Sequence, residues 1–208
     1  METAIIISGF GGQGVLLAGQ VLAYAAMEYG RYVTWIPSYG PEMRGGTANC
    51  TVIISDSPIG APIVAHPDIA IVLNRPSFDK YEPLVLPAGL LVVNSSLVAA
   101  QTARTDMESV YVPANDIAAE LGTAKMLNMA MLGAMVARRP ILPLAIIEQA
   151  LTTHLPADKA HLLEANLHVL RRGFEFILPK TEALWLSVLP QELSQPPVKD
   201  GSGRGRSL

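Results

Sequence analysis

The stretch Thr3-Ala4-Ile5-Ile6-Ile7-Ser8-Gly9-Phe10-Gly11-Gly12-Gln13-Gly14-Val15 decides the fold. Its first half is a short run rich in β-branched residues, which predicts a buried strand over residues 3–8. The glycines that follow have the G-x-G-x-x-G spacing, and apolar residues then recur at helical spacing as far as Ala26. A strand, a glycine-rich turn and a helix with one apolar stripe are therefore expected, the unit with which Rossmann-like α/β domains begin.

The glycine-rich turn is also the first candidate binding site. Glycine permits a tight turn and lets a ligand approach backbone N–H groups, and the N-terminus of the following helix adds partial positive charge. A phosphate or pyrophosphate group is the natural ligand of such a turn. The candidate residues are Gly9, Gly11, Gly12, Gln13 and Gly14. The alternative is a strand-to-helix turn without a ligand, and the spacing alone leaves both open.

The second expected strand, residues 32–36, argues against NAD or FAD. A dinucleotide-binding domain places Asp or Glu at the end of this strand to hold the ribose hydroxyls. Here the strand ends in Trp35-Ile36-Pro37-Ser38, without an acid. The lysine-containing P-loop spacing is absent too, which argues against an NTPase.

Residues 37–46, Pro-Ser-Tyr-Gly-Pro-Glu-Met-Arg-Gly-Gly, have the composition of a loop throughout. In a doubly wound sheet this loop emerges at the carboxyl ends of the strands, beside the glycine turn. Arg44 is then a candidate phosphate clamp, because its planar donors suit that geometry. The alternative is an exposed arginine in an ion pair, for example with Glu42.

The rest of the chain alternates between strands and helices and then becomes helical. Further strands are expected at 47–55, 69–73, 90–94 and 109–112, and helices at 125–137, 144–151 and 157–177. This order predicts an α/β fold: a Rossmann-like, doubly wound, largely parallel sheet with helices on both faces and a helical C-terminal part. Residues 1–180 form the expected domain, and residues 181–208, with few apolar residues, a linker and disordered tail.

Composition narrows the function further. The net charge of −3 gives no electrostatic footprint for nucleic acid or an anionic membrane, and no signal peptide or membrane span is evident, so a cytoplasmic protein is expected. Hydrophobic residues make up 50% of the chain, which indicates either a large core or a surface that meets a partner. We interpret the methionine-rich stripe over 126–135 as core.

The side chains best known for catalysis or metal binding give no recognisable site. The single cysteine, Cys50, lies in an expected buried strand and is interpreted as an inert thiol. One cysteine cannot supply a four-cysteine zinc site or iron–sulfur cluster. The four histidines share no metal-ligand spacing and are expected at the surface or at a subunit contact: His66, His154, His161 and His168.

The two loops together resemble the gamma subunits of 2-oxoacid:ferredoxin oxidoreductases. Residues 9–15 (Gly-Phe-Gly-Gly-Gln-Gly-Val) and residues 37–50 carry the resemblance, and the second string is most similar to the 2-oxoglutarate branch. The pyruvate branch usually has a Ser-Phe-Gly-Ala-Glu-Arg-Arg-Gly type of string there, and indolepyruvate enzymes a His-Gly-Met type. Residues 125–134 and the helix with Asn166 and Gly173 are also similar, so the resemblance covers residues 3–177.

The resemblance implies oxidative decarboxylation of a 2-oxoacid, 2-oxoglutarate first, to an acyl-CoA, with ferredoxin as electron acceptor. It implies that the glycine turn faces the phosphates of coenzyme A (CoA), with Arg44 nearby. Thiamine diphosphate, Mg and iron–sulfur clusters are expected in partner subunits: alpha and beta subunits and a ferredoxin-like delta subunit. The sequence agrees, because Asp200-Gly201 is its only Asp-Gly pair and no thiamine-type Gly-Asp-Gly motif occurs. The rival hypotheses are a stand-alone CoA- or nucleotide-binding regulatory module, a subunit acting on pyruvate, branched-chain or indolepyruvate substrates, and an NAD-dependent enzyme.

Overall fold

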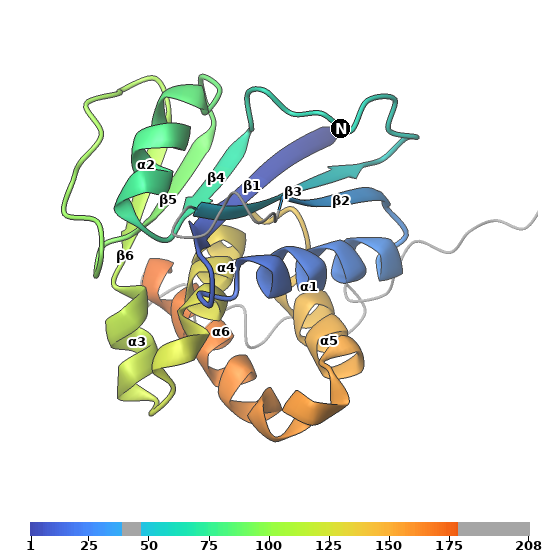
Figure 1. Cartoon of the computed structure of the whole chain (residues 1–208). Coiled ribbons are helices and arrows are strands. Elements are labelled where there is room, and N and C mark those ends of the chain that lie inside the picture. The colour runs from blue at the N-terminus through green and yellow to red at the C-terminus, as the bar shows by residue number, and fades with distance from the viewer. Residues whose placement is uncertain (39–46, 179–208) are drawn as a thin grey trace, which may run out of the picture.

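The computed structural model describes residues 1–38 and 47–178, which form a mixed sheet with helices on both faces (Figure 1). The sheet has six strands in the order β2-β3-β1-β4-β5-β6. Their bounds are β1 Glu2–Phe10, β2 Tyr32–Ser38, β3 Thr47–Ser55, β4 Ile69–Val72, β5 Leu90–Asn94 and β6 Glu108–Val112.

Five of the six strands run in the same direction. Strands β1, β4, β5 and β6 pair in parallel, whereas β3 pairs antiparallel with both β1 and β2. The largely parallel, doubly wound sheet expected from the sequence is therefore confirmed. The position of β3, inserted between β1 and β2, was not part of that expectation.

Helices cover the two faces unequally. One face carries α1 (Val15–Glu28), α3 (Ala114–Glu120), α4 (Leu127–Arg138), α5 (Leu144–His154) and α6 (Leu163–Ile177), which lie below the sheet in Figure 1. The other face carries α2 (Arg75–Tyr81) and the short 3-10 helix η2 (Glu82–Leu84). The side chains of β1 alternate between the two faces of the sheet. Ile5 and Ile7 pack into the larger hydrophobic cluster on one face, and Ile6 packs into the smaller cluster on the other.

This arrangement places a switch in the direction of the chain connections between β1 and β4. The chain leaves β1 toward α1 on one face and leaves β4 toward α2 on the other. In open α/β sheets, ligands bind at the carboxyl ends of the strands where the connections part in this way. The glycine turn, directly after β1, lies at this point of the sheet.

Several boundaries differ from the sequence expectation. Strand β2 continues through Pro37 and Ser38, which were expected in the loop; a proline is tolerated there because β2 is an edge strand. The expected helices 125–137 and 157–177 begin as 3-10 turns, η3 (Ala124–Met126) and η4 (Ala157–Leu162). Helix α2 was not expected, although Asn74 caps Ser77 N–H at 2.9 Å and a proline stands in its first turn, both start signals.

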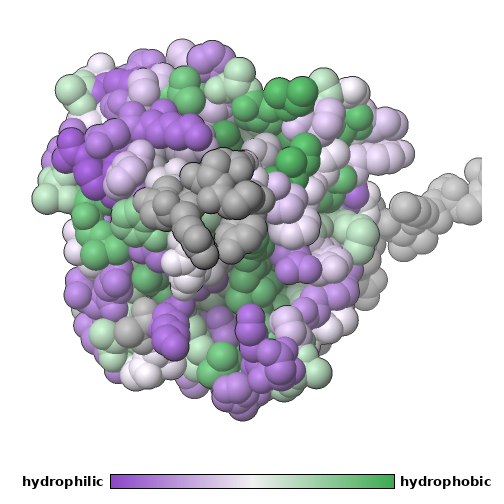
Figure 2. Space-filling view, viewed as in Figure 1, coloured by the Kyte–Doolittle hydropathy of each residue, from purple (hydrophilic) through white to green (hydrophobic). Residues whose placement is uncertain are grey.

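A large core accounts for much of the hydrophobic composition. Met129, Met131 and Met135 are fully buried, so the interpretation of the methionine stripe as core is confirmed. On the face shown in Figure 2, hydrophobic and hydrophilic residues lie in small intermixed groups.

In the described ranges no helix is both long enough and apolar enough to cross a membrane. The expected linker and tail, residues 181–208, lie outside the described residues.

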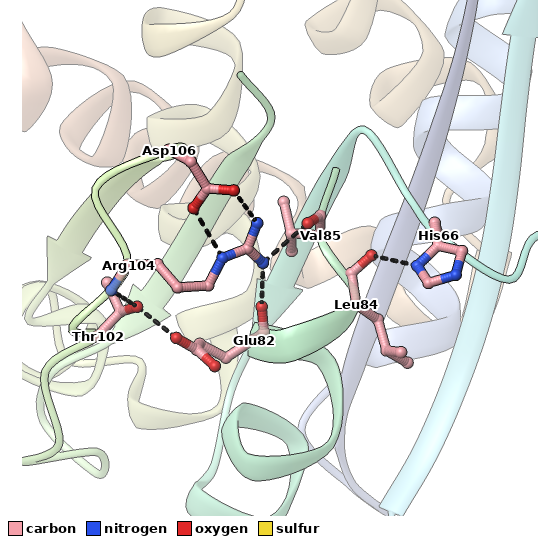
Figure 3. Close-up of polar contacts among 7 residues, drawn as sticks. All are labelled: His66, Glu82, Leu84, Val85, Thr102, Arg104 and Asp106. Atoms are coloured by element: carbon pink, nitrogen blue, oxygen red, sulfur yellow. Dashed lines mark hydrogen bonds and ion pairs between the residues drawn. The ribbon is translucent and has the colours of Figure 1, made fainter. Parts of the chain in front are cut away.

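The connection between β5 and β6 is held by an arginine (Figure 3). Arg104 forms a two-point ion pair with Asp106, at 2.9 and 2.7 Å. Its Nη1 also donates to the carbonyl oxygens of Glu82 and Val85, at 2.9 and 2.8 Å. The arginine therefore ties the connection to both ends of η2, and its donors are engaged by the protein itself.

Candidate functional site

The glycine turn begins inside β1. Gly9 and Phe10 still pair with β3, and the chain then turns so that Gly14 caps α1 with φ 74°. This left-handed conformation is one that glycine adopts readily. The side chain of Gln13 folds back onto the turn, where its Oε1 accepts the Phe10 N–H at 2.6 Å and a longer bond from Asn74 Nδ2 at 3.5 Å. In this structure Gln13 therefore braces the turn.

The glycines of the turn differ in what surrounds them. A Cβ at Gly9 would lie 2.7 Å from Gln13 Oε1, and a Cβ at Gly14 would lie 2.5 Å from Asn128 Nδ2. A Cβ at Gly11 or Gly12 would meet no atom within 4 Å. Gly9 and Gly14 are thus required by packing. Gly11 and Gly12 face open space, although the left-handed φ of Gly12, 91°, itself favours glycine.

The N-terminus of α1 adds donors to the same place. No side chain caps the helix, and its first turn contains no acidic residue. The earliest backbone bond is Ala18 N–H to Gly14 O at 3.0 Å, so the N–H groups of the first turn are left without intrahelical partners. Asn128 on α4 fixes the position of this end, because its Nδ2 donates to Gly14 O at 3.1 Å.

A pocket of about 380 Å³ opens at this point. The glycine turn and the first turn of α1 form one wall, and α4, the end of α5, η4 and α6 contribute the others. Two lysines line it, Lys125 from η3 and Lys159 from η4, together with the buried side chains Asn128 and Asn166. The remaining lining residues are apolar or glycine: Phe10, Gly11, Gly12, Gly14, Val15, Leu16, Leu17, Ala48, Met126, Leu155 and Leu162. The pocket therefore combines backbone donors and two lysines with apolar walls, an arrangement suited to a phosphate-bearing organic ligand.

The second expected site residue, Arg44, lies outside the described residues. The described ends on either side of its loop can be placed. Ser38, at the end of β2, pairs with Asn49, and Thr47, at the start of β3, pairs with Phe10 of the glycine turn. Both ends are thus at the same edge of the sheet as the turn, as expected for the loop.

The fold gives a second, geometric reason to exclude NAD, besides the absence of Asp or Glu at the end of β2. In a dinucleotide-binding domain the second strand lies beside the first, so that its last residue reaches the ribose. Here β3 lies between them, which places the end of β2 two strands away from the glycine turn. Neither the residue type nor the position of this strand end suits NAD.

The other candidates remain structural. Cys50 is fully buried in β3, and burial raises the pKa of its thiol to about 12, so the inert interpretation is supported. His154 stacks on Tyr24 and contacts Glu28 Oε1 at 2.5 Å, joining α5 to α1. Among the described residues no group of three or more potential ligands could hold a metal ion.

Sequence reasoning missed four residues of this pocket as site residues. Lys125, Asn128 and Asn166 were noted only as part of a family resemblance, and Lys159 was not noted. An asparagine that becomes buried inside a predicted apolar helix, such as Asn128, is a usable signal, because buried polar side chains need a partner. An exposed lysine such as Lys159 gives no comparable signal.

Comparison with known proteins identifies the family. The pyruvate ferredoxin/flavodoxin oxidoreductase family matches residues 4–176. The chain is 38% identical over 178 residues to the ketoisovalerate oxidoreductase subunit VorA of Methanothermobacter thermautotrophicus, covering 84% of this chain and 36% of that protein. It therefore spans about a third of the length of that relative. It is 35% identical to the 2-oxoglutarate synthase subunit KorC of Methanocaldococcus jannaschii, covering 84% of this chain and 94% of KorC.

Solved structures agree with the sequence relatives. The keto/oxoacid ferredoxin oxidoreductase gamma subunit of Geobacter sulfurreducens superposes with a TM-score of 0.73 at 32% identity, covering 84% of this chain and 98% of that one. The 2-oxoglutarate:ferredoxin oxidoreductase of Magnetococcus marinus, solved with 2-oxoglutarate, coenzyme A and succinyl-CoA bound, has a TM-score of 0.76 at 20% identity, a likeness of fold that covers 86% of this chain and 32% of that one. The chain belongs to the pyruvate ferredoxin/flavodoxin oxidoreductase family, among the gamma subunits of 2-oxoacid:ferredoxin oxidoreductases.

Proposed function

We propose that this chain supplies the CoA-binding part of a 2-oxoacid:ferredoxin oxidoreductase complex, which converts a 2-oxoacid to an acyl-CoA. One observation carries the proposal: Gly11 and Gly12 face open space in the same pocket that receives Lys125, Lys159 and the uncapped start of α1. Gly12 needs glycine for its left-handed backbone, φ 91°, whatever the space around it. At Gly11 neither the backbone conformation nor the packing requires glycine, and two lysines line the same pocket. A phosphate-bearing ligand accounts for all of these features.

In this proposal the chain binds and orients CoA. The glycine turn and the first turn of α1 donate backbone N–H groups to phosphate oxygens, and Lys125, Lys159 and Arg44 supply positive charge. Asn128 holds the start of α1 in place through Gly14 O. By fixing one end of CoA, these residues would direct its thiol toward the reacting centre in a partner subunit, which makes the acyl transfer effectively unimolecular.

The chain's own residues fit binding and not redox chemistry. Its single cysteine is fully buried and cannot ligate a four-cysteine cluster. Thiamine diphosphate with Mg would supply decarboxylation, and iron–sulfur clusters electron transfer to ferredoxin, in alpha, beta and delta partner subunits. We therefore propose a subunit that is inactive without these partners.

Two acids compete as the substrate. The relative matched over nearly its whole length is named for 2-oxoglutarate, and that acid is our first proposal. The VorA relative, named for ketoisovalerate, has slightly higher identity, and this favours a branched-chain 2-oxoacid as the second candidate. The acid itself would be recognised largely by partner subunits.

Reconstitution tests this proposal. The chain should be purified alone and together with its partner subunits, and reduction of ferredoxin should be followed with CoA and with 2-oxoglutarate, ketoisovalerate or pyruvate. We expect the chain alone to be colourless and inactive, and the complex to require both this chain and CoA. Activity of the partners without this chain, or recovery of the chain only as a lone homo-oligomer that binds CoA, would favour the stand-alone binding module instead.

A further inference from the structure

The pocket beside the glycine turn is lined by two lysines in addition to the backbone donors of the turn. Lys125 and Lys159 come from separate elements, η3 and η4, and both line the pocket. Among the described lining residues none is acidic, and neither lysine has an ion pair in the described part of the chain. Several arginines differ in this respect: Arg31, Arg104 and Arg171 each pair with a carboxylate. Lys80 on α2 likewise has no ion pair in the described part of the chain, but it does not line the pocket.

Two buried asparagines add a second, independent feature. Asn128 and Asn166 are each 3% exposed and line the pocket. Their Nδ2 groups are used, by Gly14 O at 3.1 Å and Leu162 O at 2.8 Å. No described residue donates to either Oδ1, and neither oxygen is among the fully enclosed atoms without a partner. Because both residues line the pocket, we take these acceptors as available to a ligand there.

The Oδ1 acceptors of Asn128 and Asn166 indicate what kind of ligand the pocket suits. A carbonyl oxygen on an amide needs an N–H or O–H donor, which fully ionised phosphate or sulfate does not offer. A nucleotide offers donors on its base and ribose as well as phosphate groups, and its base suits the apolar walls. The volume of about 380 Å³ is near the lower end of the range for ligand sites, so the pocket fits a nucleotide-sized part of CoA and not the whole molecule.

We infer that Lys125 and Lys159 bind a second phosphate group, separate from the one at the glycine turn, and so make the subunit specific for CoA over dephospho-CoA. This inference rests on the proposed function and deepens it. Dephospho-CoA retains the pyrophosphate, the base and the pantetheine arm, and lacks only the phosphate on the ribose. The turn and α1 would bind what the two molecules share, and the lysines would bind what distinguishes them.

The test uses the assembled complex with CoA and dephospho-CoA as alternative substrates. We expect the wild-type complex to prefer CoA in kcat/KM. Lys125→Met and Lys159→Met keep the apolar stem and remove the charge. Each should reduce the preference by about tenfold, because a charge-assisted contact corresponds to one to two decades of affinity. Lys159→Arg should retain the preference, and Lys80→Met, on α2 at the other face of the sheet, is the matched control.

Each remaining result overturns the inference. A wild-type complex that uses the two substrates equally well would show that the pocket does not read the ribose phosphate, whereas CoA binding at the glycine turn would be unaffected. Lysine variants that lose CoA and dephospho-CoA to the same extent would place the lysines on the shared pyrophosphate. Lysine variants that keep the wild-type preference would leave these residues as ordinary surface cations.

Discussion

Two pairs of glycines have very different surroundings. One pair, Gly133 and Gly173, lies where α4 and α6 cross, and the other, Gly11 and Gly12, lies in the turn after β1. A Cβ at Gly133 would lie 2.0 Å from the carbonyl oxygen of Leu170, and a Cβ at Gly173 equally close to a carbonyl oxygen of α4. A Cβ at either loop glycine would meet nothing within 4 Å. The first pair lets two helices touch, and the second leaves room that the protein does not fill. The same residue type thus serves helix packing in one region and leaves open space in the other, where we propose a binding site.

The cations show the same contrast. Arg104 donates to Asp106 and to two backbone carbonyls, and so holds the connection between β5 and β6 in place (Figure 3). Lys125 and Lys159 line the pocket without an ion pair in the described part of the chain. Groups whose partners lie within the protein contribute to stability, whereas the two lysines are available to the ligand that we propose.

The largest effect on stability is expected at the helix crossing. Gly133→Ala should lower the free energy of unfolding by about 3 kcal/mol, because the new methyl group forces the two backbones apart. For a domain of this size that corresponds to a fall in melting temperature of about 6–12 °C. Calorimetry or circular dichroism checks it, with Gly60→Ala as the control, since Gly60 has open space around it. A melting temperature equal to that of the control would show that the contact between α4 and α6 does not require glycine at position 133.

A smaller effect is expected at Gly14, which belongs to the turn but not to its open part. Alanine there adopts a left-handed conformation at a cost of about 1–2 kcal/mol and also meets Asn128. Gly30→Ala, at φ 82° in open space, measures the conformational cost alone. We expect Gly14→Ala to melt lower than Gly30→Ala. Equal melting temperatures would mean that Asn128 does not hold the start of α1.

The smallest effect concerns pH at the Arg104 contact. Hydrogen bonding to Arg104 holds the pKa of Asp106 below its ordinary value, so this carboxylate contributes stability above the unfolded pKa of about 3.9 and loses it as the pH falls. Arg104→Met should therefore melt a few degrees below wild type at pH 7, and the difference should shrink below about pH 4. Melting curves from pH 7 to 3 test this. A difference that stays constant over this range would assign the effect to the backbone contacts of Arg104 alone.

The sequence predicted the local units well and their arrangement less completely. Residues 3–28 were assigned as strand, turn and helix because periodicity and glycine spacing are local signals. The insertion of β3 between β1 and β2 could not be predicted, because strand pairing depends on contacts that periodicity does not record. Strand β2 ran further than expected, since the rule against proline in strands relaxes at a sheet edge.

Only part of the candidate site could be predicted, because the sequence shows local signals and not which distant residues the fold brings together. The glycine turn is contiguous in sequence, so its place between a strand and a helix could be predicted. Lys125 and Lys159 reach the pocket from elements more than a hundred residues further along the chain, and only the fold brings them to the turn. Gln13, expected to face the ligand, accepts the Phe10 N–H through its Oε1 in this structure. A polar side chain next to a turn can bond the backbone of the turn or a ligand, and the sequence does not show which.

The most direct test of the CoA site is a single methyl group at Gly11. Its φ lies outside the left-handed region and a Cβ there has open space, so Gly11→Ala should melt within a degree or so of wild type. If CoA phosphates lie against the turn, the methyl group should weaken CoA binding to the assembled complex by about ten- to a hundredfold, as expected for steric overpacking of 1–3 kcal/mol. Titration calorimetry with Gly60→Ala as the control measures this. An unchanged melting temperature together with unchanged CoA affinity would contradict the proposed site.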